Sequence, residues 1–159
     1  MKRLKGSVLL VFLITVIVAG CGTEGSVSDK EVDIKASTPE GNVESKIKQE
    51  VPTEEELGLP IYPNAEVDKD ASGTIENTTK EGTSKYEGLV LITGDDYNTV
   101  VNWYRERLSG MPGFFDMTMG QSDSGTALFS VGTDKEARVV TITEGTDGKT
   151  QITVASATR

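Results

Sequence analysis

The residues with the clearest capacity for chemistry are oxygen-bearing side chains at alternate positions near the middle of the chain. Asp68, Asp70 and Ser72 offer such oxygens, and Gly73 and Ile75 follow them. Calcium takes about six to eight oxygen ligands, and a glycine at the sixth position of a binding loop permits the sharp turn that the ligands need. The spacing therefore makes Asp68, Asp70 and Ser72 candidate calcium ligands.

This segment resembles the first eight positions of an EF-hand calcium loop, but two parts of that loop are missing. The twelfth position, where a bidentate Glu is expected, is Thr79, and the flanks are proline-rich or strand-like. The alternative is an acidic turn between strands, where Asp, Ser and Gly are common. We favour the turn, and calcium is the one cofactor that the sequence suggests.

Asp95 and Asp96 form a second acidic pair, which could act as catalytic carboxylates. They directly precede a run with the spacing of one helical face: Tyr97, Val100, Val101, Tyr104, Leu108 and Met111. A short carboxylate at that place accepts hydrogen bonds from the free amides of the first helical turn. We therefore interpret one of the pair as the helix N-cap, and we expect the helix to end at Gly110.

The composition excludes several classes of function. The 159-residue chain contains no histidine and one cysteine, which excludes Ser-His-Asp and Cys-His nucleophile systems, His-ligated zinc and an internal disulfide. Its net charge of −9 argues against nucleic acid as a partner, because that binding depends on Lys and Arg side chains that neutralise phosphates.

The N-terminal segment has the pattern of an export signal. Three basic residues lie within the first five positions, before an apolar run at 8–19 that is broken only by Thr15. The run is shorter than the ~20 apolar residues that a membrane-spanning helix needs. Residues 1–20 are therefore predicted to be a signal peptide. The alternatives are an uncleaved membrane anchor and a buried helix.

The apolar run ends in Val18-Ala19-Gly20-Cys21, which resembles the lipobox of bacterial lipoproteins. In that family the cysteine thiol receives a diacylglyceryl group and becomes the N-terminus after cleavage, so the resemblance implies that Cys21 is the lipidation site. Two acyl chains anchor a protein stably, whereas one chain holds it only marginally. The implied location is the cell membrane or the outer membrane, with the remaining chain outside the cytoplasm.

Residues 22–56 are predicted to be an acidic, disordered linker. They hold ten acids and four lysines among 35 positions, with no aromatic residue. Such a composition does not bury enough apolar area to offset the entropy lost on ordering. The alternative is a helix through Val43, Ile47 and Val51 in a complex, which the neighbouring prolines limit. We expect the linker to hold a domain of residues 57–159 away from the membrane.

Residues 57–159 are predicted to form a small α+β domain. Strands are expected at 72–77, 86–93, 114–119, 126–132, 137–143 and 150–157. Asp147-Gly148 predicts a two-residue hairpin between the last two strands. With the helix after residue 96, the order is β-β-α-β-β-β-β. The predicted fold is an antiparallel sheet of about five or six strands with one main helix packed on one face.

Two aromatic residues are candidate partner contacts. Trp103 lies about 100° from the centre of the apolar face of the predicted helix, and Tyr62 lies between two prolines. Exposed aromatic side chains often anchor protein interfaces. Both side chains could equally close the edge of the core, and for Trp103 we favour the core.

Two segments carry a second resemblance. The run from Leu59 to Ala65 (Leu-Pro-Ile-Tyr-Pro-Asn-Ala) and the later Val101-Asn102-Trp103-Tyr104 resemble a small domain of uncharacterised bacterial envelope lipoproteins. The resemblance implies a lipid-anchored accessory domain and assigns no catalytic residue.

The sequence therefore predicts a membrane-anchored extracytoplasmic lipoprotein whose domain binds, or assembles with, an envelope protein or a glycan. The alternative is a small carboxylate-dependent hydrolase of envelope polymers, which needs two acids facing one cleft. A two-lobed solute receptor is disfavoured, because roughly 100 residues do not supply two lobes.

Overall fold

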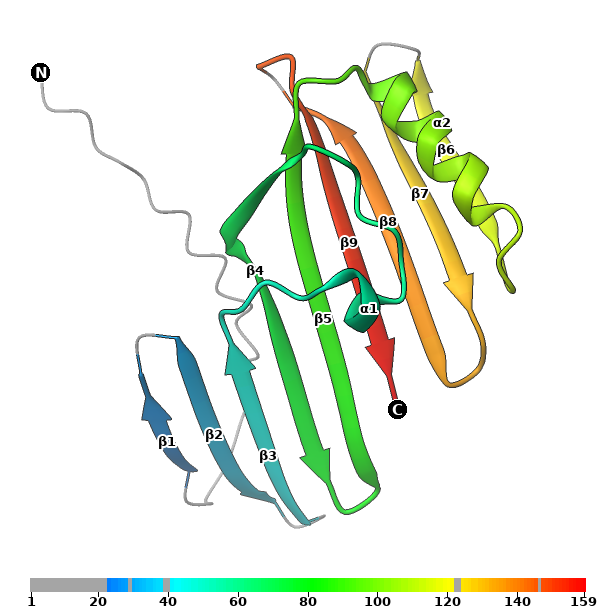
Figure 1. Ribbon diagram of the computed structural model, residues 1–159. Helices are drawn as coiled ribbons and strands as arrows, with labels where there is room; N and C mark the ends of the chain where they lie inside the picture. Colours follow the sequence, from blue (N-terminus) through cyan, green and yellow to red (C-terminus); the bar gives the residue numbers. More distant parts are fainter. Residues whose placement is uncertain (1–22, 29, 39–40, 122–123, 146) are drawn as a thin grey trace, which may run out of the picture.

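The computed structural model describes residues 23–28, 30–38, 41–121, 124–145 and 147–159. Cys21 and the predicted signal peptide lie outside these residues. The described residues form nine strands and two helices (Figure 1). The strands are β1 (Thr23–Val27), β2 (Glu31–Thr38), β3 (Gly41–Lys48), β4 (Glu66–Thr79), β5 (Gly82–Thr93), β6 (Phe115–Gln121), β7 (Ser124–Gly132), β8 (Glu136–Glu144) and β9 (Thr150–Thr158), and the helices are α1 (Glu54–Leu57) and α2 (Tyr97–Leu108).

All the strands belong to one antiparallel sheet, in the order β1-β2-β3-β4-β5-β9-β8-β7-β6. Every neighbouring pair is consecutive in the chain except β5 and β9. After β5 the chain crosses through α2 to the far edge of the sheet, starts again at β6 and returns strand by strand (Figure 1). The C-terminal strand β9 therefore lies inside the sheet, between β5 and β8.

The helix α2 begins where the sequence predicts. The Asp96 carboxylate caps it by accepting a hydrogen bond from the Thr99 amide at 2.9 Å. The apolar side of α2 packs on β7 and β8. The helix ends at Leu108 with Ser109 as a right-handed C-cap, so the predicted cap at Gly110 is wrong.

The core lies between one face of the sheet and a layer made of α1, α2 and the chain at 57–62 (Figure 1). Apolar side chains at every second position of β5, β7, β8 and β9 point into it. The fully buried members include Leu57, Leu89, Leu91, Phe129, Val140, Ile142, Ile152 and Val154, with Val100 and Tyr104 from α2.

The predicted fold class is wrong, because the described residues form a mostly β protein with nine strands rather than an α+β domain with five or six. The additional strands β1, β2 and β3 lie in the segment 22–56 that was expected to be disordered. Val32, Ile34 and Ala36 alternate with charged residues along β2. This period of two is typical of a strand with two unlike faces. Short connections let β1 pair with β2 and β2 with β3, and β3 pairs with β4 after the longer connection that contains α1.

The last hairpin also differs from the prediction. The loop between β8 and β9 spans 145–149 and is therefore longer than two residues. Gly148 has a φ of 75°, and the Gly145 amide closes the loop by donating to the Lys149 carbonyl at 2.6 Å. Asp147 does not have a positive φ. The predicted two-residue turn needs a positive φ at both of its central residues, so it does not form.

Candidate interaction surface

The strand register places a continuous set of side chains on the sheet face opposite α1 and α2, which we call the uncovered face. Ile47 of β3 lies directly across from Ile75 of β4, which lies directly across from Tyr86 of β5. Directly opposite residues of neighbouring strands share a face. Leu89, three positions after Tyr86, points the other way and is fully buried. The three side chains therefore form an apolar row on the uncovered face.

A second apolar group lies on β6, at one edge of the same face. Phe115, Met117 and Met119 alternate along this strand, and Met117 lies directly across from Leu128 of β7. The register continues from β7 through β8 and β9 to Tyr86 without a change of face. The uncovered face thus holds seven large apolar side chains that are between 38 % and 56 % exposed: Ile34, Ile47, Ile75, Tyr86, Phe115, Met117 and Met119.

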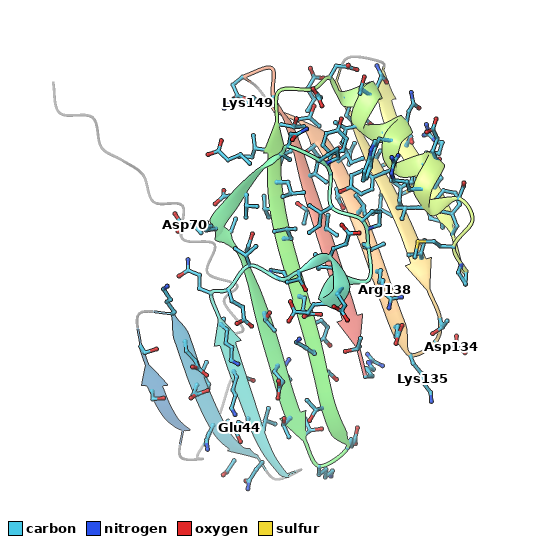
Figure 2. All side chains as sticks on the ribbon, viewed as in Figure 1. Glu44, Asp70, Asp134, Lys135, Arg138 and Lys149 are labelled. Carbon is cyan, nitrogen blue, oxygen red and sulfur yellow. The ribbon has the colours of Figure 1, made fainter. Side chains whose placement is uncertain are left out.

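The two faces of the sheet differ sharply in charge. Two charged residues of the described strands, Glu66 and Asp68, lie on the uncovered face according to the register. This count leaves out the irregular segment 69–72 of β4. The opposite face carries the other charged strand residues, and several of these form ion pairs. Lys35 of β2 pairs with Glu44 of β3 at 3.5 Å, and Arg138 pairs with Glu136 of the same strand at 2.8 Å. Figure 2 labels Glu44 and Arg138 on this helix-bearing side.

Small side chains separate the apolar groups on the uncovered face. Gly88 of β5 lies across from Ala155 of β9, and Tyr86 lies across from Ala157. These positions therefore carry little side-chain volume, whereas β4 and β6 on either side carry Ile75 and Met117. Such relief gives a second surface room to interdigitate.

The two predicted contact residues lie on the other side of the sheet, in an aromatic cluster. Tyr62 is only 5 % exposed, and its ring centroid is 5.1 Å from that of Trp103 and 6.3 Å from that of Tyr104. The Arg107 guanidinium lies over the Trp103 ring at 3.9 Å. The Tyr62 hydroxyl donates to Asp95 at 2.8 Å. Burial, together with this hydrogen bond to Asp95, raises the pKa of Tyr62 to about 12. This placement is typical of the edge of a core.

The candidate calcium ligands lie at a break in the pairing of β4 with β5, between Asp68 and Gly73. The Asp68 carboxylate accepts hydrogen bonds from the amides of Asp70 and Ala71 at 3.1 and 3.2 Å. The buried Ser72 hydroxyl donates to the Asp68 carbonyl at 2.7 Å. These contacts organise a β-bulge from the chain's own groups. Within the described part of the chain, no group of three or more acids, histidines or cysteines could hold a metal ion.

The helix-bearing side also contains a buried acid. Glu87 is 5 % exposed and is the one buried acid among the described residues. Its carboxylate pairs with Lys85 at 2.7 Å and accepts a hydrogen bond from the Ser156 hydroxyl at 3.0 Å. This ion pair keeps the pKa of Lys85 above its usual range. The Lys85 ammonium and the Ser156 hydroxyl thus both contact the carboxylate of Glu87.

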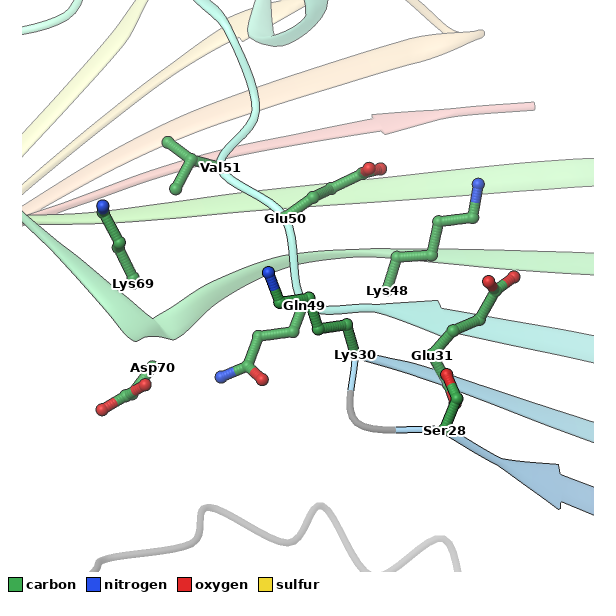
Figure 3. A pocket seen from close by; sticks show the side chains of 9 residues that line it. All are labelled: Ser28, Lys30, Glu31, Lys48, Gln49, Glu50, Val51, Lys69 and Asp70. Atoms are coloured by element: carbon green, nitrogen blue, oxygen red, sulfur yellow. The ribbon is translucent and has the colours of Figure 1, made fainter.

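An open hollow of about 670 Å³ lies where the connection after β3 meets the irregular part of β4 (Figure 3). Lys30, Lys48 and Lys69 line it together with Glu31, Glu50 and Asp70. Glu31 is half-buried and the other five are exposed. Its charges balance, and nothing in it selects a ligand of either sign.

Sequence reasoning missed the residues of the uncovered face. The available signal was the alternation of apolar and polar residues along β2, and again at Phe115, Met117 and Met119. The signal that joins these strands into one surface is their pairing register, which the sequence does not display.

The described residues thus define a class: an antiparallel β protein with helices on one face of its sheet and, on the other, a nearly uncharged surface on which exposed apolar side chains lie among uncharged polar ones. Comparison of the chain with protein-family models, curated proteins and solved structures gives no match. Within the described ranges, neither helix is long and apolar enough to cross a membrane.

Proposed function

We propose that this chain is a lipoprotein, anchored in the cell membrane or outer membrane through Cys21, whose sheet binds a protein of the cell envelope outside the cytoplasm. The observation that carries the binding role is the uncovered face, with its exposed apolar side chains and its near absence of charge. Extended apolar patches on a protein surface mark protein or membrane interaction sites. The lipobox-like Val18-Ala19-Gly20-Cys21 supports the anchor.

The chemistry of the face favours a protein over a glycan as its partner. Tyr86 and Phe115 are separated by the intervening strands β9, β8 and β7, so they do not form a continuous platform for a sugar chain. Met and aromatic residues are enriched at protein interfaces, and Met117 and Met119 adapt their shape to a partner because the side chain is unbranched and flexible.

The position of the first strand supports a sheet that lies close to the bilayer. β1 begins at Thr23, two residues after Cys21. Two residues span at most ~7 Å, so a lipid on Cys21 would hold the β1 edge of the sheet near the headgroups. The module would then project from the membrane with β6 as its distal edge.

The anchor is tested by replacing Cys21 with serine in the native host. The Cys21→Ser chain should incorporate no labelled fatty acid and should leave the membrane fraction in a flotation gradient. Val18→Leu is the matched control, because it keeps an aliphatic residue at that place in the pattern and should behave as the wild type. Continued flotation of Cys21→Ser with membranes would refute the anchor.

A further inference from the structure

We infer that the uncovered face docks a second copy of this chain, so that two sheets pack back to back at the membrane. This inference rests on the proposed function, because it names the partner of the surface proposed there. Three features of the molecule carry it: the distribution of charge, the size of the face and the position of the anchor.

Charge determines which surfaces of two identical chains can approach. With a net charge of −9, two copies repel each other across most of their surface. Outside the irregular segment 69–72, the only charged residues of the described strands that the register places on the uncovered face are Glu66 and Asp68. Both lie in the part of β4 that precedes this segment. Two such faces can meet with most of their contacts between uncharged side chains, because Glu66 and Asp68 lie together at the beginning of β4.

The size of the face matches that of a stable dimer interface. Nine strands at a spacing of ~4.8 Å span about 38 Å, and an average of about nine residues per strand at ~3.4 Å spans about 31 Å. The resulting area of about 1,200 Å² is large enough for the ~800 Å² that each partner of a standard protein interface buries. A short peptide or a single sugar would leave most of this face in water.

The relief of the face and the anchor permit a closed two-fold arrangement. Packed sheets lie about 10 Å apart and interdigitate, and the low strip at Gly88, Ala155 and Ala157 leaves room for bulky side chains of a second sheet. A two-fold axis that runs between the sheets from the β6 edge to the β1 edge keeps both β1 edges at one end. Both lipids then reach the same bilayer, and the interface closes after two copies.

Site-specific photo-crosslinking of the full chain tests the docking directly. Tyr86→p-benzoylphenylalanine places the reactive group at an exposed aromatic position of the uncovered face. Thr83→p-benzoylphenylalanine is the matched control, because Thr83 is exposed on the same strand and faces the other way. We expect a two-chain adduct from Tyr86, and at least about tenfold less from Thr83. No two-chain adduct from Tyr86, or equal adducts from both positions, would overturn the inference.

Placing a charge in the proposed interface is a second test of the inference. Ile75→Lys, added to the Tyr86 crosslinking chain, should weaken dimerisation at least about tenfold, because the two-fold axis buries two unpaired lysines. Thr78→Lys adds the same charge on the opposite face of β4 and should leave the adduct unchanged. Ile47→Lys repeats the test on β3, and circular dichroism establishes that each variant is folded. A two-chain adduct that survives both lysine variants at the wild-type level would contradict the inference.

The outcomes also separate this inference from the proposed function. Crosslinking from Tyr86 in native membranes that captures a different protein in place of a second copy would overturn the dimer and leave the binding role standing. Failure of the Cys21 flotation test would remove the anchor, and the photo-crosslinking result on the purified chain would stand on its own.

Discussion

Replacing Tyr62 with phenylalanine should lower the free energy of unfolding by about 1 kcal/mol. The substitution removes only the hydroxyl and leaves the ring against Trp103 and Tyr104. The lost hydrogen bond runs to the Asp95 carboxylate over 2.8 Å, and bonds to charged groups contribute about 1.5–3 kcal/mol. Asp95 is exposed, so water replaces the lost donor and the effect falls below that range.

Tyr62→Ala is the comparison that separates the ring from the hydroxyl. Removing a buried aromatic ring costs about 3–5 kcal/mol, because Trp103 and Tyr104 then border a cavity. Urea unfolding can be followed by fluorescence of Trp103, the one tryptophan of the chain. With a slope near ~2 kcal/mol per molar urea, the midpoint should fall by about 0.5 M for Tyr62→Phe and about 2 M for Tyr62→Ala.

The pH dependence gives an independent measurement of the same contact. Because the pKa of Tyr62 rises to about 12 in the folded chain, against about 10 when unfolded, its contribution to stability is complete below about pH 10 and is lost as the pH rises toward 12. Tyr62→Phe should lack this part of the alkaline loss. If Tyr62→Ala shifts the midpoint no more than Tyr62→Phe does, the ring is not part of the core, and Tyr62 is available to a partner.

Two further predictions concern the sheet and its edge. Gly73→Ala should destabilise the protein by about 1–3 kcal/mol, because the added Cβ would lie 2.6 Å from the Lys48 carbonyl oxygen. Gly88→Ala on the paired strand meets nothing closer than 4.0 Å and should change the urea midpoint little. Equal effects of the two substitutions would contradict the close approach of β3 to β4. The Arg105 guanidinium holds the pKa of Asp116 below its usual range, so the stabilisation from this pair is present above about pH 4 and is lost as the pH falls through the lowered value. Asp116→Asn should therefore remove part of the acid sensitivity of unfolding, and an unchanged acid transition would show that the pair contributes nothing.

The part of the fold that could be predicted is the part with large apolar residues at a clear period. The start of the helix was placed correctly because the acidic pair Asp95-Asp96 precedes a regular apolar stripe. The strands β5 to β9 were expected at nearly their observed positions. In β5, for example, Leu89 and Leu91 occupy alternate positions of a run that is bounded by turn residues. Periodicity identifies such elements because one side of each must be buried.

The strands β1 to β3 were missed for a physical reason. Averaged over 22–56, the composition is acidic and poor in apolar residues, and this average conceals the strict alternation of Val32, Ile34 and Ala36 with charged residues. These strands add no residue to the buried core cluster, and they join the sheet through the pairing of β3 with β4, of β2 with β3 and of β1 with β2. The pairing of β3 with β4, which places Ile47 directly across from Ile75, cannot be derived from the local sequence.

The charge distribution on β1 to β3 connects the fold to the proposed partner. The buried core cluster contains no residue of this extension, so the core does not require either of its faces to be apolar. One face nevertheless carries Lys35, Glu44 and Lys46 in paired contacts, while the other carries Ile34 and Ile47 and continues across the sheet to Met119. Because the core does not need these apolar residues, we propose that the second copy of the chain covers them. Substitutions in the core should therefore alter unfolding, whereas substitutions on the uncovered face should alter association first.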